Sequence, residues 1–204
     1  MDSDRAGRMD GLCVSDCQQC PALVASRSQI VNGVGPADAD LLFVGEAPGA
    51  TEDAEGEPFV GRSGAVLDDQ LAAAGLDRSA VRITNCVRCR PPENRDPNAA
   101  ELAACRSYLE TEIRRVDPSV VVTLGKVPSE HLLGRSVAVS TEAGTVERVR
   151  FGDEHPYRVL VCLHPAATLY DRSQESTFAE TIRTAADLVG GPVTDGGQSR
   201  LGQF

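Results

Sequence analysis

The sequence of 204 residues has no tryptophan, few other aromatic residues and almost no lysine. Lys126 is the single lysine, and every other one of the 20 basic residues is an arginine. An acidic chain nearly free of lysine is typical of proteins in high salt, where carboxylates keep the surface hydrated, so the composition indicates a halophilic source. A GC-rich genome favours arginine codons in the same way without any salt, and both explanations remain open.

Long hydrophobic runs are also absent. Apolar stretches reach about six residues, whereas a membrane-spanning helix needs about 20. The first dozen residues are polar and mixed in charge, unlike a secretory signal. We therefore expect one globular domain, no membrane partner and a location in the cytoplasm. The net charge of −10 argues at first against a polyanionic partner such as DNA.

Four short runs rich in Val and Leu each end at a turn, and they cover residues 40–44, 81–84, 119–124 and 158–163. Because they are almost continuously apolar, they predict buried parallel strands. Helical patterns occupy 64–74, 98–116, 127–133 and 175–189, and 137–151 predicts a hairpin before the last strand. The alternation predicts an α/β fold, a three-layer αβα sandwich with a central four-stranded parallel sheet. This single domain would cover 13–189, with mobile segments at 1–12 and 190–204.

Unusual residues follow three of these four runs. GEAPG (45–49) follows the first, NCVRCRPPENRDP (85–97) the second and HPAATL (164–169) the last. In open parallel sheets, ligands bind beyond the carboxyl ends of the strands. The three loops therefore predict one shared binding site.

Seven cysteines in a chain without a secretion signal argue for a metal site and against a disulfide framework. Cys17 and Cys20 form one C-x2-C pair, and Cys86 and Cys89 form another. Four thiolates suit either a zinc ion or a [4Fe–4S] cluster, and spacing alone does not separate the two. Cys105 lies on the apolar face of its predicted helix, where a ligand and a buried hydrophobe are both open interpretations.

Together, the motifs resemble the family 4 uracil-DNA glycosylases, the iron–sulfur branch of that superfamily. They are GEAPG with the following ED at 52–53, GEPFVGRSG at 56–64, ITN at 83–85, CRPPENR at 89–95, the Cys105 position and LHP at 163–165. The resemblance covers about residues 13–190. It implies hydrolysis of the N-glycosidic bond of deoxyuridine in DNA, which releases uracil and leaves an abasic site. The nucleotide must first be flipped out of the stack into a pocket.

The resemblance implies a role for several residues of such a pocket. Phe59 would stack on the uracil ring, Asn85 would read its Watson–Crick edge, and His164 would donate a hydrogen bond to a uracil oxygen. Ala47 stands where the best-known uracil glycosylases carry an aspartate. Glu46 is therefore the candidate that orients water or stabilises positive charge on the sugar.

Two further sets of residues carry implied roles. Glu52 is placed at the pocket wall, where it would exclude a thymine methyl group, although a solvated loop charge is the alternative for it and for Asp53. Leu169 is implied as the wedge that fills the gap in the duplex, with Thr168 beside it. Tyr170 stands where an arginine or lysine is expected, which replaces a charge contact with stacking or a hydroxyl contact.

The resemblance also implies which cysteines bind the cofactor. Cys17, Cys20, Cys89 and Cys105 would hold a [4Fe–4S] cluster, and Cys86 would be a non-ligand. Such a cluster would be structural, because hydrolysis transfers no electrons. The alternatives are a non-catalytic iron–sulfur or zinc module associated with DNA, and a glycosylase with relaxed base specificity.

The implied partner is uracil-containing DNA, single- or double-stranded, together with repair or replication proteins, and we expect a monomer. Residues 78–115 hold eight arginines against five acidic residues, which predicts a basic patch on this acidic chain. In molar salt such a patch adds little affinity, because salt weakens phosphate contacts. The acidic composition is then no argument against a DNA substrate.

Overall fold

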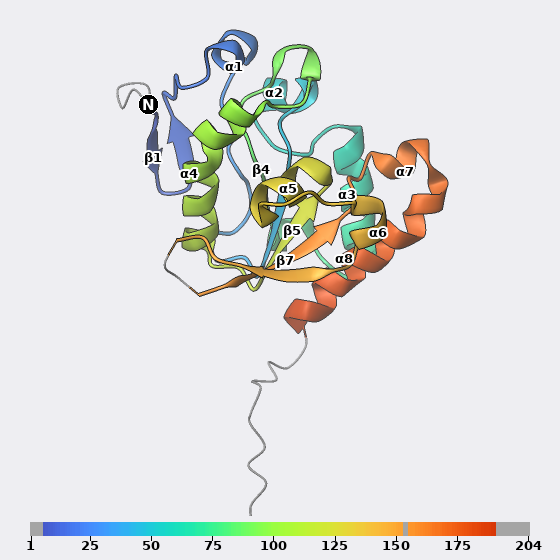
Figure 1. Cartoon of the computed structure of the whole chain (residues 1–204). Helices are drawn as coiled ribbons and strands as arrows, with labels where there is room; N and C mark the ends of the chain where they lie inside the picture. Colours follow the sequence, from blue (N-terminus) through green and yellow to red (C-terminus); the bar gives the residue numbers. More distant parts are fainter. Residues whose placement is uncertain (1–5, 153–154, 191–204) are drawn as a thin grey trace, which may run out of the picture.

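The computed structural model describes residues 6–152 and 155–190. A central sheet has the strand order β4-β3-β5-β7-β6, and helices cover both of its faces (Figure 1). Its strands are β3 (Leu41–Gly45), β4 (Arg82–Asn85), β5 (Val120–Leu124), β6 (Val146–Val149) and β7 (Tyr157–Cys162). The three-layer α/β architecture predicted from the sequence is confirmed.

The four predicted strands are present, but the prediction of a four-stranded, all-parallel sheet is wrong because the sheet has a fifth strand. The four apolar runs form β3, β4, β5 and β7, which pair parallel to one another. However, β6 pairs antiparallel with β7, so the sheet has five strands and is mixed. Strand β6 lies at an edge, where its residues alternate between exposed and half-buried. This strand is part of the predicted hairpin, whose first half forms a short helix instead.

The helices lie between the strands in the chain. They are α1 (Pro21–Ser26), α2 (Ala50–Glu55), α3 (Arg62–Ala73), α4 (Ala99–Val116), α5 (Lys126–Leu133), α6 (Val139–Glu142), α7 (Ala167–Tyr170) and α8 (Glu175–Gly190), with single 3-10 turns at Arg78–Ala80, Pro92–Asn94 and Arg172–Gln174. Helix α4 begins at the predicted cap. The Asn98 side chain accepts from the Glu101 N–H at 3.0 Å, and the Glu101 carboxylate accepts from the Asn98 N–H at 2.9 Å.

In the described part of the chain, one hydrophobic cluster packs on each face of the sheet, and a third surrounds Leu23, Val87 and Cys89. Because successive strand residues point to opposite faces, Phe43 belongs to one cluster and Val44 to the other. Helices α3 and α8 contribute Leu67 and Phe178 to the first cluster, and α4 contributes Ile113 to the second. Both faces of the sheet are therefore buried. The accessible part of the sheet is the end at which the parallel strands terminate and their following loops begin.

The N-terminal boundary lies earlier than predicted. Strand β1 (Arg8–Asp10) pairs antiparallel with β2 (Cys13–Ser15), so part of the segment expected to be mobile is folded. Asn32 holds this hairpin, because its amide accepts from the Val14 N–H at 2.7 Å and donates to the Val14 carbonyl at 3.1 Å. Beyond Gly190, the predicted C-terminal tail lies outside the described residues.

Across residues 6–152 and 155–190, no helix combines the length and the apolar character that crossing a membrane requires.

Candidate active site and cysteine cavity

A pocket of about 190 Å³ lies at the carboxyl ends of β3, β4 and β7. The residues that line it are Ala47, Gly49, Glu52, Phe59, Ser63, Asn85 and His164. Three loops that lie far apart in the sequence thus meet at one edge of the sheet, as the pattern of strand ends predicts. Gly49 and Ser63 lie within the motifs quoted from the sequence, but neither of them was predicted to line the pocket.

Close packing between β3 and β4 places the Asn85 side chain. Asn85 ends β4 and is paired with Gly45 at the end of β3. A Cβ atom added at Gly45 would lie 2.4 Å from Asn85 Oδ1 and 2.5 Å from the Phe59 ring. Glycine at position 45 therefore allows the amide and the ring to approach the strand backbone directly.

Phe59 holds an uncommon backbone conformation. Its φ angle is +55°, in the left-handed region that bulky side chains rarely adopt. The ring is buried, with its centroid 6.0 Å from that of His164. Strain of this kind persists only where the surroundings enforce it, and it concentrates at functional sites. It marks Phe59 as a fixed wall of the pocket.

Glu52 connects two loops of the pocket wall. One of its carboxylate oxygens accepts from the Gly49 N–H at 3.1 Å, and the other accepts from the Gly61 N–H at 2.9 Å. The adjacent Asp53 is also buried and accepts from the Ser28 N–H at 2.9 Å. The alternative of solvated loop charges is therefore wrong for both residues.

His164 has a defined tautomer. Its Nδ1 atom accepts a hydrogen bond from the Ala166 N–H at 3.1 Å, which leaves the proton of a neutral imidazole on Nε2. Burial lowers the pKa of His164, so the neutral form dominates at pH 7. His164 thus offers an Nε2–H donor without carrying a charge.

Asn85 has an unsatisfied acceptor. Its Oδ1 atom is buried and has no hydrogen-bond partner among the described residues. A buried acceptor left without a partner costs about 1–3 kcal/mol. Its presence in the lining of the pocket indicates a ligand that supplies an N–H or O–H donor.

Glu46 lies beside this pocket and is not among its lining residues. Its side chain is hydrogen-bonded to Asp96, from the loop after β4. Burial and the neighbouring Asp96 charge raise the pKa of Glu46 to about 7. Glu46 therefore changes its protonation state near neutral pH. Nothing in the sequence pairs Asp96 with Glu46, because only the folded loop brings them together.

Helix α7 carries the predicted wedge on the surface. The large hydrophobic side chains of Leu169 and Tyr170 are 40% and 85% exposed. Thr168 and Leu169 line a groove of about 370 Å³ that also includes Gln70 and Arg172. This groove is distinct from the pocket around Asn85, so the wedge residues do not line that pocket.

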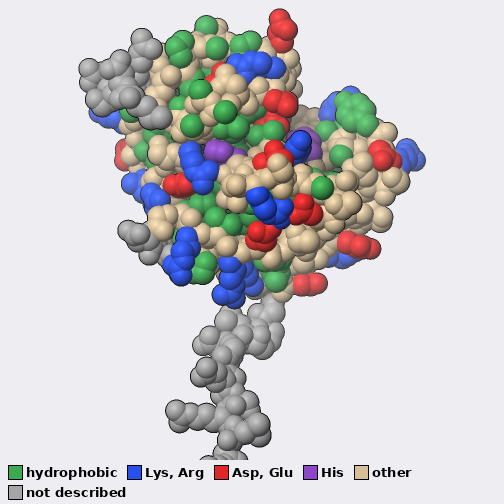
Figure 2. Space-filling view, viewed as in Figure 1, with side chains coloured by type: hydrophobic (Ala, Val, Ile, Leu, Met, Phe, Trp, Pro, Cys, Tyr) green, Lys and Arg blue, Asp and Glu red, His purple; other side chains and the backbone are tan. Residues whose placement is uncertain are grey.

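Ion pairs engage five of the eight arginines in the predicted basic patch over residues 78–115. Arg82 and Arg88 are buried against Glu112, while Arg78, Arg95 and Arg106 pair with Asp68, Glu101 and Glu110. Figure 2 shows positive and negative side chains interspersed over the visible face. The sequence count included Glu101, Glu110 and Glu112 but did not show which arginines they pair with, and Asp68 lies outside the counted segment.

A second, smaller cavity of about 20 Å³ brings four cysteines together. Cys17, Cys20, Cys89 and Cys105 line it, as do Leu23, Arg27, Arg88 and Tyr108. Cys86, the predicted non-ligand, is buried and is not part of this lining. The segment before α1, the loop after β4 and helix α4 therefore meet at a cluster of sulfur atoms.

Burial raises the pKa of Cys20 to about 11 and that of Cys105 to about 12. A metal would have to displace these protons, because the thiolate is the ligand. Within residues 6–152 and 155–190, no three His, Cys, Asp or Glu side chains are arranged to hold a single metal ion. Four thiols around one cavity supply the ligand type that zinc and iron–sulfur clusters both take.

Comparisons with known proteins confirm the resemblance. A model of the Uracil DNA glycosylase superfamily matches residues 32–188. The chain is 36% identical over 182 residues to the Type-4 uracil-DNA glycosylase of Archaeoglobus fulgidus, which covers 87% of this chain and 90% of the relative. It is 37% identical over 187 residues to that of Saccharolobus solfataricus, covering 89% and 86%.

A Type-5 uracil-DNA glycosylase of Pyrobaculum aerophilum is more distant, at 29% identity over 206 residues, covering 84% of this chain and 88% of the relative. The Type-4 relatives therefore share more with this sequence than the Type-5 relative does. Since the superfamily model matches most of the chain and these type-4 relatives are 36–37% identical over nearly all of it, the chain belongs to the uracil-DNA glycosylase superfamily and to its type-4 group.

Proposed function

We propose that this uracil-DNA glycosylase takes a uracil flipped out of DNA into the pocket at the sheet edge and hydrolyses its N-glycosidic bond. The orphaned Asn85 Oδ1 carries the proposal, because uracil presents an N–H between two carbonyl oxygens. Asn85 Oδ1 would accept from that N–H while Nδ2 donates to a neighbouring carbonyl. Cytosine presents a lone pair and an amino group at the same two positions, so each contact would become repulsive.

The pocket walls would hold the ring and limit its size. Phe59 supplies a flat buried face on which the base stacks. Glu52 fixes the loops on either side of this ring. By holding the pocket wall in place, it would leave no room for the methyl group of thymine. This role needs no contact between its engaged oxygens and the base.

His164 would stabilise the leaving group. When the bond between the sugar carbon C1′ and uracil N1 breaks, the electron pair leaves with uracil and spreads onto its oxygens. A neutral Nε2–H donor aimed at one of these oxygens strengthens its hydrogen bond as the charge develops. The tautomer set by the Ala166 N–H makes His164 suitable for this role.

Glu46 would act on the sugar side of the reaction. Water forms the new bond to C1′, and its proton passes to a neighbouring base or to solvent. The Glu46 carboxylate, next to Asp96, would orient this water or stabilise the positive charge on the sugar. Ala47 lines the pocket with a methyl group, so no carboxylate acts from that position.

Helix α7 would contact the DNA around the flipped nucleotide. Leu169 would enter the gap left in the duplex, with Thr168 beside it. The Thr168 hydroxyl donates to the Pro165 carbonyl at 2.9 Å, which holds the start of this helix to the loop that carries His164. Insertion of the wedge and binding of the base would therefore be linked through one short segment.

The cysteine cavity would hold a [4Fe–4S] cluster through Cys17, Cys20, Cys89 and Cys105, whose convergence on one cavity supports this ligand set. When bound, the cluster would supply cross-links and no electron transfer to the hydrolysis. Its ligands would tie the N-terminal segment and α4 to the loop that begins at Asn85. We further propose that the protein is a monomer in the cytoplasm. It would act on single- or double-stranded DNA together with repair or replication proteins.

The test uses anaerobically purified protein with U:G duplexes and uracil-containing single strands. We expect release of uracil from either substrate, a visible absorption band and about four irons per chain for one such cluster. The variant His164→Ala should lower the single-turnover rate about 10²–10³-fold without altering that band. A colourless protein that holds zinc and releases no uracil would contradict the proposal.

A further inference from the structure

Two arginines border the cysteine cavity without a part in the proposed hydrolysis. Arg27, which directly follows α1, donates from Nη1 to Cys89 Sγ at 2.8 Å and from Nη2 to the Cys17 carbonyl at 2.7 Å. One guanidinium group thus contacts two proposed ligand residues, Cys17 and Cys89, that lie far apart in the sequence. Arg88, the residue before Cys89, lines the same cavity.

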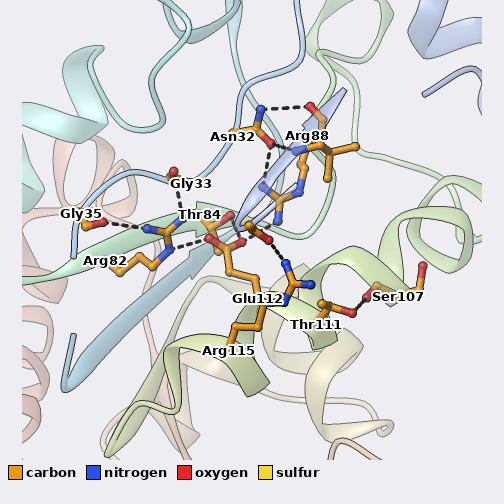
Figure 3. Close-up of polar contacts among 12 residues, drawn as sticks. Asn32, Gly33, Gly35, Arg82, Thr84, Arg88, Ser107, Thr111, Glu112 and Arg115 are labelled. Atoms are coloured by element: carbon orange, nitrogen blue, oxygen red, sulfur yellow. Dashed lines mark hydrogen bonds and ion pairs between the residues drawn. The ribbon is translucent and has the colours of Figure 1, made fainter. Parts of the chain in front are cut away.

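Arg88 also belongs to a buried ionic network. Its Nη2 atom donates to Glu112 Oε2 at 2.6 Å, and Arg82 Nε donates to Glu112 Oε1 at 2.6 Å. Figure 3 shows both guanidinium groups converging on this single carboxylate. The side chains of Arg88 and Glu112 are 2% and 0% exposed. Two buried cations therefore share one buried anion.

This imbalance is costly unless further negative charge lies close by, because the interior does not hydrate an excess cation. Asn32 Oδ1 accepts from Arg88 Nη1 at 3.2 Å, but an amide carries no net charge. Among the carboxylates nearest the sulfur atoms, Glu101 pairs with Arg95, and Asp53 accepts from backbone N–H groups. Thiolates in the adjacent cavity would supply the missing negative charge.

We infer that Arg27 and Arg88 form a cationic wall that holds the anionic cluster in place and raises its reduction potential. The inference rests on the proposed cluster. A positive charge and a hydrogen bond to a ligand sulfur both favour the more negative, reduced form. The Tyr108 hydroxyl, 3.7 Å from Cys17 Sγ, provides a weaker third polar contact.

Arg27→Gln tests this most cleanly, because Arg27 is half-buried and lies outside the Glu112 network. Each variant is purified anaerobically, its iron and sulfide are counted, and its reduction potential is measured by titration followed by electron paramagnetic resonance. Bleaching of the visible band in air gives a second readout independent of glycosylase activity. Arg135→Gln is the matched control, since Arg135 pairs with Glu142 and Glu147 at a distant exposed site.

We expect Arg27→Gln to have a lower reduction potential than the wild type and to lose its band about tenfold faster. Arg27→Lys, which keeps the charge but not the two-pronged geometry, should lie between them. Arg135→Gln should match the wild type. A folded Arg27→Gln that retains little iron would support the holding role equally.

Two results separate the possible failures. If the wild type holds the cluster and Arg27→Gln shows the same potential and the same bleaching rate, the cationic wall is refuted. If the wild type holds no iron and no sulfide, the proposed cluster itself is refuted, and the wall with it.

Discussion

At the scale of single residues, the raised pKa of Glu46 gives the proposed reaction a pH dependence. Burial and Asp96 raise the pKa of Glu46 from 4.5 to about 7, so its carboxylate is lost as the pH decreases through 7. Since the ionised form is the one that would serve the sugar, kcat/KM should rise with pH and level off above pH 7. Burial lowers the pKa of His164, so this residue is neutral on the plateau above pH 7.

Asp96→Asn checks this assignment. Removing the Asp96 charge lowers the pKa of Glu46, so the acidic limb of the kcat/KM profile should move to lower pH. The plateau above pH 7 should change little, because Glu46 is already ionised there. If the midpoint pH of the acidic limb is the same in Asp96→Asn as in the wild type, the limb does not arise from Glu46 and Asp96.

How far the site could be predicted also depends on single residues. The ends of the apolar runs located the loops that carry Asn85 and His164, because parallel sheets bind ligands there, and the family resemblance implied the roles of these two residues. Asp96, Ser63 and Arg27 were not found, because their neighbours are set by loop paths that leave no local pattern. The family resemblance placed Glu52 at the pocket wall, but its two backbone contacts, which join loops far apart in the sequence, were not predicted.

At the scale of elements, helix α7 carries Tyr170, which the sequence places where a basic residue is expected. An aromatic ring that is 85% exposed beside the wedge can stack on a base next to the flipped nucleotide. Such a stack contributes about 1–3 kcal/mol. Tyr170→Ala should therefore weaken DNA binding at high and low salt alike, as measured by fluorescence anisotropy with an uncleavable duplex.

Tyr170→Phe and Val146→Ala serve as controls for this prediction. The first keeps the ring, and the second removes an exposed apolar side chain from β6. Both should bind as the wild type does. A large loss in Tyr170→Phe would assign the contact to the hydroxyl group instead.

The network around Glu112 joins β4 to α4. Removing one partner of a buried ion pair leaves an uncompensated charge and costs about 3–5 kcal/mol. Glu112→Gln should therefore lower the free energy of unfolding in urea by about that amount, since two arginines would lose their only shared carboxylate. Glu147→Gln, at an exposed pair, should leave stability nearly unchanged. Equal stability of both variants would contradict the role of this network.

The strands were predictable to the extent that burial dictates them. β3, β5 and β7 are covered on both faces and read as continuous apolar runs, whereas β6 is a short edge strand with an alternating pattern. The β1–β2 hairpin depends on Asn32, a contact that no local signal predicts. Edge strands and hairpins held by distant side chains are therefore where sequence patterns give the least information.

At the scale of the whole molecule, most arginines of segment 78–115 are engaged within the protein, so few remain for phosphate groups. Each phosphate contact adds about 0.9 to the slope of log affinity against log salt. Three of the eight arginines remain outside these ion pairs, so we expect a slope of magnitude about 3 for duplex binding, against about 7 if all eight contacted DNA. A titration from low to molar salt measures it, and a slope near the higher value would contradict the ion pairs described.

Acidic composition and a DNA substrate are compatible on this basis, because stacking and the apolar wedge depend little on salt. Whether high salt or genome composition selected the arginines stays open, and the hypothesis of a halophilic source stays a prediction. What holds the molecule to its substrate is expected to be the pocket around Asn85 and the exposed side chains of α7.

The most direct measurement is the single-turnover rate of uracil release by Asn85→Ala from a U:G duplex, compared with the wild type. Loss of both amide contacts should reduce that rate at least about 100-fold, while the visible spectrum and the unfolding curve remain those of the wild type. An Asn85→Ala protein that releases uracil at the wild-type rate would contradict the assignment of this pocket.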